Sequence, residues 1–137
     1  SYADYKKRIF KIMSEKAERD NLIYKICVVE DEPLIRKIAC RMLTKLGHTV
    51  VEAKHATEAL ELIEAANTDI VFSDISMPGL LNGVELAEQI AIKYPNIKFI
   101  LTTGYFNEDI ASRAIKLGKL ISKPYKLNDL KEAIDDL

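Results

Sequence analysis

The stretch that decides the fold is ICVVEDEPLIR, residues 26–36, in which a short apolar run is followed at once by Glu30 and Asp31. Two more apolar runs end in a charged residue: IVFS is followed by Asp74, and LIS is followed by Lys123. If these runs are neighbouring parallel strands, their carboxyl ends meet and bring three carboxylates and one ammonium together. Carboxylates that lie so close together repel one another and resist full ionisation. A hard cation such as Mg²⁺ relieves this repulsion, because it takes carboxylate oxygens as ligands. The pattern predicts a Mg²⁺ site beside a lysine, which suits a phosphoryl group.

From residue 26 onward, short apolar runs alternate with amphipathic stretches. Five β–α units in a row predict an α/β fold, namely a flavodoxin-like, doubly wound, five-stranded parallel sheet in the order 2-1-3-4-5 with helices on both faces. In such sheets, ligands bind at the switch point between strands 1 and 3, where the acidic residues would lie. We expect strands at residues 26–29, 49–53, 69–73, 98–102 and 120–122, and helices at residues 33–46, 56–65, 84–94, 107–117 and 127–137. In the first of these helices an apolar stripe is formed by Leu34, Ile38, Met42 and Leu46.

Residues 1–24 do not follow this alternation, so we divide the chain into an N-terminal helix or linker at residues 1–24 and an α/β domain at residues 25–137. Residues 1–25 are net positive, with seven Lys or Arg and four Asp or Glu. A helical stripe predicts one extra amphipathic helix of about four turns. Three interpretations stay open: this helix docks on the domain, dimerises with a second copy, or is the stub of a linker. The stripe consists of Tyr2, Tyr5, Ile9, Ile12 and Met13.

The length, charge and composition of the chain exclude several classes of function. The chain has 137 residues and a net charge of −1, which favours a single α/β domain and gives no bulk electrostatic reason for direct nucleic-acid binding. We expect no membrane insertion, because no apolar run approaches the roughly 18–20 residues that span a bilayer. A signal-peptide pattern is also missing, and Cys27 and Cys40 lack metal-site spacing. These features predict a cytoplasmic protein with reduced thiols.

Four stretches together resemble the receiver domain of two-component response regulators: ICVVEDEPLIR, DIVFSDISMPG, LTTG and SKPY. The resemblance covers about residues 25–137. It implies that Asp74 is the phosphoacceptor, whose carboxylate takes a phosphoryl group from a phosphohistidine on a histidine kinase or histidine phosphotransfer protein. It also implies a chain that is not an enzyme beyond catalysing its own phosphorylation and dephosphorylation.

The resemblance also implies a set of residues around Asp74. Positioning and neutralisation of phosphoryl oxygens supply most of the catalysis in such transfers. The metal, Mg²⁺ or Mn²⁺, would be held by Glu30, Asp31, Asp74 and the backbone carbonyl of Ser76. The phosphoryl group would be bound by Lys123 and by the hydroxyl of Thr103, which directly precedes Gly104 as in the family pattern.

Signalling would follow from the charge of the phosphoryl group, since phosphorylation adds a charge of about −1.5 to −2. The resemblance implies that Thr103 and the loop after it move toward the phosphoryl group. The face formed by residues 107–117, 120–122 and 127–137 would then bind or release a downstream protein partner. Leu120 stands where the family usually has an aromatic residue, so Tyr105 or Phe106 are the candidate switch aromatics. The loop MPGLLNG, one residue longer than usual, resembles receivers attached to hybrid sensor kinases.

Other functions remain as alternatives. A degenerate receiver would act as a phosphorylation-independent protein-binding module, although every site residue is present. A phosphatase resembling the haloacid dehalogenases would need an aspartate where Ser76 stands. A flavin carrier would need a hydroxyl-rich loop after the first strand, where this chain has EDEP.

Overall fold

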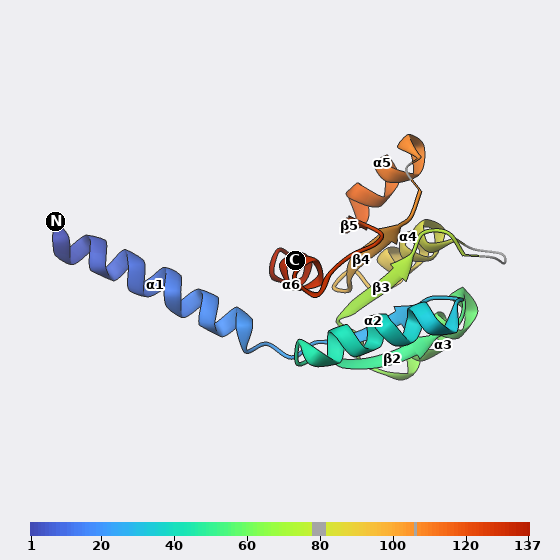
Figure 1. The fold of residues 1–137 in the computed structure, drawn as a ribbon, viewed down its shortest axis with the longest axis horizontal. Coiled ribbons are helices and arrows are strands. Elements are labelled where there is room, and N and C mark those ends of the chain that lie inside the picture. The colour runs from blue at the N-terminus through green and yellow to red at the C-terminus, as the bar shows by residue number, and fades with distance from the viewer. Residues whose placement is uncertain (78–81, 106) are drawn as a thin grey trace.

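The computed structural model describes residues 1–77, 82–105 and 107–137, and its centre is a five-stranded parallel sheet (Figure 1). The strand order β2-β1-β3-β4-β5 confirms the predicted doubly wound topology. Asp74 belongs to the third strand itself rather than to the loop after it. The strands are β1 (Lys25–Val29), β2 (Thr49–Ala53), β3 (Ile70–Asp74), β4 (Lys98–Thr103) and β5 (Lys119–Ser122).

Helices cover both faces of this sheet, as the alternating sequence predicts. Within β1, Cys27 and Val29 pack toward α3, α4 and α5, whereas Ile26 and Val28 pack toward α2 and α6. Burial on both sides explains why the central strands β1, β3 and β4 contain continuous apolar runs. The helices are α2 (Pro33–Lys45), α3 (Ala56–Ala65), α4 (Gly83–Lys93), α5 (Glu108–Leu117) and α6 (Leu127–Asp135).

The buried face of α2 is not its most apolar stripe. Leu34 is 73% exposed and Ile38 is 44% exposed, although both belong to the stripe singled out in the sequence. The small side chains of Ala39 and Cys40, with Leu43, instead face the sheet and let the helix approach it closely. The first half of that stripe is therefore left at the surface, whereas Met42 and Leu46 are partly buried against the core.

The N-terminal helix α1 (Tyr2–Asp20) has 19 residues and is longer than the four turns expected from the sequence. Figure 1 shows it extending away from the sheet and its helices. None of its residues, all of which the structure describes, is buried. At its C-terminal end, Lys131 of α6 donates to Asp20 at 3.2 Å. The structure therefore does not dock the length of α1 on the α/β domain.

Both cysteines are buried thiols, and burial raises the pKa of Cys27 to about 12 and that of Cys40 to about 11. Within residues 1–77, 82–105 and 107–137, every helix is too short or too polar to span a bilayer.

The two faces of α2 make a direct comparison. Replacing the fully buried Leu43 with alanine is expected to lower the free energy of unfolding by about 2–5 kcal/mol, because a cavity remains in the core. Leu34→Ala on the exposed stripe should change it by no more than about 0.5 kcal/mol. Urea unfolding of both variants measures the difference, and equal losses would contradict the orientation of α2.

Candidate functional site

Three carboxylates gather at the carboxyl ends of β1 and β3. Glu30 and Asp31 directly follow β1, Asp74 ends β3, and these two strands are hydrogen-bonded neighbours. Each of the three residues offers an oxygen within 4.8 Å of the others. Glu30 and Asp74 are buried and Asp31 is half-buried. An all-oxygen cluster of this kind has the ligand chemistry that hard divalent cations prefer.

Lys123 reaches this cluster from the end of β5. Its Nζ lies 2.7 Å from Oδ2 of Asp74 and 3.5 Å from Oε2 of Glu30. Burial alone would lower the pKa of Lys123, but the hydrogen bond and charge of Asp74 outweigh it, and the pKa is raised. The lysine is therefore held as a cation between two carboxylates. The peptide bond from Lys123 to Pro124 is cis.

The pKa of Glu30 is strongly shifted from its ordinary value. Burial, and then the neighbouring charge of Asp74, raise the pKa of Glu30 to about 7, even though the N–H of Glu32 and the charge of Lys123 act in the opposite direction. The Glu32 N–H donates to Glu30 Oε1 at 3.3 Å. One lysine therefore only partly offsets the crowding of negative charge, and a divalent cation would offset it further.

Asp74 is held by the backbone as well as by Lys123. Its Oδ1 accepts the N–H of Ser76 at 3.0 Å. Gly83, the first residue of α4, approaches so closely that a Cβ there would lie 2.1 Å from the carbonyl oxygen of Asp74. Only glycine fits this contact, which places the N-terminus of α4 against the end of β3. The role of the Ser76 carbonyl stays a prediction, and residues 78–81 of the MPGLLNG loop lie outside the described residues.

Thr103, at the end of β4, has its hydroxyl engaged in its own loop. This hydroxyl accepts the N–H of Tyr105 at 3.2 Å and donates to the Tyr105 carbonyl. The side chain of Tyr105 is 78% exposed, and Phe106, the other candidate switch aromatic, lies outside the described residues. Leu120 is half-buried against the core beneath α3, α4 and α5. Thr102, which precedes Thr103 in β4, is buried, whereas Thr103 is half-buried, and the phosphoryl-binding role of Thr103 stays a prediction.

Arg36 is a residue that the sequence analysis did not single out. It is buried in α2, its Nη1 donates to the carbonyl oxygen of Glu30 at 2.8 Å, and its Nε donates to Oε1 of Glu52 at 3.2 Å. Arg36 therefore fixes the backbone that presents the acidic pair. An arginine on the first predicted helix, with a glutamate on the next strand, was the available signal for this contact.

An apolar groove of about 410 Å³ opens beside the cluster. Lys123 lines it together with three apolar residues of α2, so the groove leads directly to the lysine that contacts Asp74. Its other lining residues are Ile35, Ile38, Met42, Gly104, Pro124 and Tyr125.

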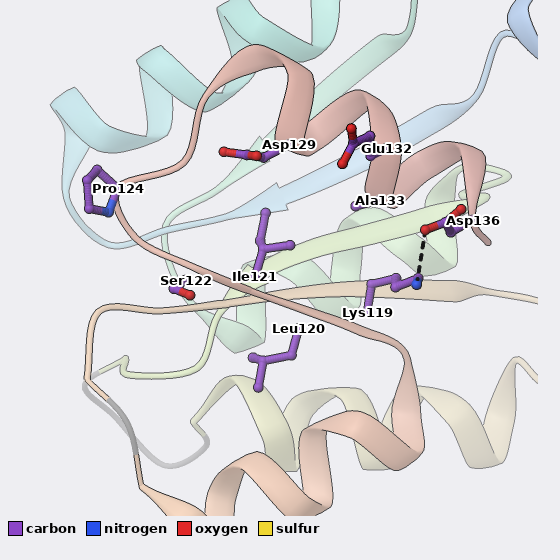
Figure 2. A pocket seen from close by; sticks show the side chains of 9 residues that line it. All are labelled: Lys119, Leu120, Ile121, Ser122, Pro124, Asp129, Glu132, Ala133 and Asp136. Atoms are coloured by element: carbon purple, nitrogen blue, oxygen red, sulfur yellow. Dashed lines mark ion pairs between the residues drawn. The ribbon is translucent and has the colours of Figure 1, made fainter.

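A second hollow, of about 450 Å³, lies between β5 and α6 (Figure 2). Figure 2 shows Ile121 pointing toward α6 and Leu120 pointing to the opposite side of the strand. Lys119 pairs with Asp136 at 3.2 Å. With Asp129 and Glu132 also at its wall, this hollow carries an excess of negative charge.

The two cations that pair with Glu52 provide a matched test of Arg36. Arg36→Gln should lower the free energy of unfolding by about 1.5–3 kcal/mol, because a charge-assisted bond to the Glu30 carbonyl is lost. Lys37, which is exposed and contacts Glu52 at 2.8 Å, should tolerate the same change within about 0.5 kcal/mol. Urea unfolding and the NMR amide shifts of residues 30–32 report both effects, and equal responses of the two variants would count against the assigned role.

Comparison with known proteins agrees with this arrangement. The family described as Response regulator receiver domain matches residues 26–135. The chemotaxis protein CheY homolog of Campylobacter jejuni is 33% identical over 119 residues, covering 82% of this chain and 91% of that protein. Sporulation initiation phosphotransferase F of Bacillus subtilis is 27% identical over 112 residues, covering 80% of this chain and 90% of that protein. The sensor kinase CckA of Brucella abortus is 34% identical over 116 residues, and this chain spans 12% of its length.

Solved structures of receiver domains also resemble this chain. The response regulator protein TrrA of Thermotoga maritima, in complex with Mg²⁺-BeF, matches with a TM-score of 0.75 and 32% identity over 82% of this chain and 97% of its own. A receiver domain protein from Clostridium thermocellum matches with a TM-score of 0.76 and 30% identity, covering 82% and 92% of the two chains. The chain therefore belongs to the response regulator receiver domain family.

Proposed function

We propose that Asp74 accepts a phosphoryl group from the phosphohistidine of a histidine kinase or histidine phosphotransfer protein. A carboxylate oxygen of Asp74 attacks phosphorus, the bond from phosphorus to the donor nitrogen breaks, and the imidazole leaves with the electron pair. The observation that carries the proposal is the contact of Lys123 Nζ with Asp74 Oδ2 at 2.7 Å, within reach of two more carboxylates. This arrangement leaves a cationic and an acidic partner around the same nucleophile.

The acidic cluster fits a divalent cation. Glu30, Asp31 and Asp74 would hold Mg²⁺ or Mn²⁺ together with the backbone carbonyl of Ser76. When bound, the cation supplies positive charge to the phosphoryl oxygens and relieves the repulsion among the carboxylates. The raised pKa of Glu30 supports this fit, because it reflects burial first and then the charge of Asp74, and a bound cation would stabilise the charged carboxylate against both.

Lys123 and Thr103 would bind the transferred group. Lys123 would exchange its contact with Asp74 for one with a phosphoryl oxygen, and Thr103 would give up its bonds to Tyr105 for the same purpose. The Lys123 N–H already donates to the Thr103 carbonyl at 2.8 Å, so the two residues are coupled through the backbone. The coupling joins the loop after β4 to β5 and would shift the face formed by α5, β5 and α6. Tyr105 and Phe106 are the candidate aromatics of this switch.

The apolar groove beside Lys123 suits the phosphodonor. A phosphohistidine reaches Asp74 only if its carrier contacts the rim of the cluster. That rim includes Ile38 and Met42 of α2, whose stripe would pack against apolar side chains of the carrier. A downstream partner would instead use the α5-β5-α6 face, where the hollow of Figure 2 is acidic and favours a basic surface.

We infer that the chain catalyses nothing beyond its own phosphorylation and dephosphorylation. A degenerate receiver that binds proteins without phosphorylation is not favoured, because the acidic cluster and its lysine are intact. The relatives include a sensor kinase and a sporulation phosphotransferase, which supports a histidine kinase as the phosphodonor.

Labelling of the acceptor tests the proposal. With acetyl phosphate and Mg²⁺, the chain should gain the mass of one phosphoryl group, and Asp74→Asn should gain none, since an amide is a far weaker nucleophile. Asp69→Asn is the matched control, because Asp69 precedes the same strand at its other end, where it accepts the Lys25 N–H. Intact-mass spectrometry measures both. An Asp74→Asn chain that still takes up label would refute the assignment.

Metal binding should depend on pH through Glu30. Because its pKa is raised to about 7, Glu30 must lose a proton to bind a cation below that pH. The apparent affinity for Mg²⁺ is expected to be about tenfold weaker near pH 6 than near pH 8, with proton release on binding. Calorimetry in buffers of different ionisation enthalpy measures the released proton. Glu30→Gln should bind Mg²⁺ more weakly but without this pH dependence, and an equal affinity of the unmodified chain at both pH values would contradict the role of Glu30.

A further inference from the structure

The helix α1 carries an apolar stripe that nothing else in the described chain covers. Tyr2, Tyr5, Ile9 and Ile12 recur at intervals of three, four and three residues, which is the spacing of a coiled-coil seam. All four side chains are exposed, and the helix extends away from the α/β domain (Figure 1). We propose that α1 pairs in antiparallel orientation with α1 of a second copy of this chain.

A helix of this length favours a partner. The 19 residues of α1 span about 28 Å, and in proteins most of the stability of a helix comes from packing its amphipathic face rather than from helix propensity. Ser1 caps the helix with a reciprocal Ser1–Asp4 bond pair, which is a local stabilisation only. Burial of the apolar stripe of α1 against a partner would supply this stabilisation.

The residues that continue the seam set the orientation. The same spacing leads from Ile12 to Lys16 and then to Arg19. In a parallel pair, each of these cations would face its own copy. In an antiparallel pair, Lys16 and Arg19 face Tyr5 and Tyr2 of the second copy, where an aromatic ring accepts a cation favourably.

The distribution of charge points the same way. Residues 1–11 hold four basic residues and one acidic residue, whereas residues 12–20 hold three acidic and two basic residues. Parallel pairing would place the two basic N-terminal halves side by side. Antiparallel pairing places the basic half of each helix beside the acidic half of the other. Arg8 and Glu15 flank the seam. In the antiparallel register Arg8 of each copy lies beside Glu15 of the other copy, which gives two symmetric ion pairs.

A second copy fits this surface better than a lipid surface does. Lys16 and Asp20 lie in line with the apolar stripe, and the first turn and second half of the helix add Asp4, Glu15 and Glu18, which an anionic membrane would repel. Antiparallel pairing also places the two receiver domains at opposite ends of the helix pair. Each acidic cluster then stays open to its phosphodonor, so the pairing stands independently of phosphorylation at Asp74.

Charge reversal in the full 137-residue chain tests the pairing. Sedimentation velocity over a range of micromolar concentrations is expected to show a reversible dimer. Arg8→Glu or Glu15→Arg alone should weaken dimerisation by about tenfold, and the double variant should restore it, because both ion pairs re-form with reversed sign. Lys7→Glu is the matched control, since position 7 lies away from the seam. A chain that stays monomeric throughout, or a double variant no stronger than the single ones, would overturn the proposal.

Crosslinking tests the orientation separately. Arg8→Cys and Glu15→Cys chains are mixed and treated with a short bis-maleimide, while the native thiols Cys27 and Cys40 remain buried. Antiparallel pairing predicts a crosslink between the two different variants, and parallel pairing would crosslink each variant to itself. Ile9→Asp should abolish the crosslink without affecting the α/β domain, which α1 does not help to bury. If the chain instead stays monomeric and sediments with anionic vesicles in a manner that requires Ile9, the stripe is a lipid-binding face and the proposal fails.

Discussion

The contact between Lys123 and Asp74 is the constraint around which this receiver domain is built. Two carboxylates at the ends of adjacent strands are buried, and this burial, followed by the repulsion between them, raises the pKa of Glu30. Burying a charged side chain away from water costs several kcal/mol of folding free energy unless the charge is paired. Lys123, which directly follows β5, supplies part of that compensation from across β4, so β4 and β5 must end on the same side of the sheet as β1 and β3. The site therefore requires the complete sheet, and the sheet tolerates an acidic cluster because the lysine is there.

Two helices on opposite faces of the sheet hold this cluster in place. Arg36 reaches from α2 to the backbone of Glu30, and Gly83 brings the start of α4 against the carbonyl of Asp74. Each contact fixes the main chain rather than a charged side chain. The carboxylate side chains are thus left to change partners in the proposed transfer, while these two contacts hold the main chain at the ends of β1 and β3. A phosphoacceptor in two-component signalling needs this combination of a rigid frame and exchangeable ligands.

The sequence predicted the sheet order and the convergence of the acidic residues, because continuous apolar runs that end in charge report both burial and strand ends. It did not predict which face of α2 is buried. Periodicity offers a stripe through Leu34 and Ile38 and another through Ala39 and Leu43, and only packing against the sheet selects the smaller one. Arg36 escaped notice for a related reason: its partners lie on another strand and in a backbone carbonyl, which a linear pattern does not show.

The bonds of Thr103 explain how a switch could work without the usual aromatic residue at position 120. Its hydroxyl is held by Tyr105, and its carbonyl accepts the N–H of Lys123. In the proposed mechanism, a phosphoryl group on Asp74 draws both Lys123 and Thr103, so the loop after β4 and the start of the β5–α6 connection respond together. The response then passes through the backbone into β5 and does not require an aromatic ring to fill a space beside it.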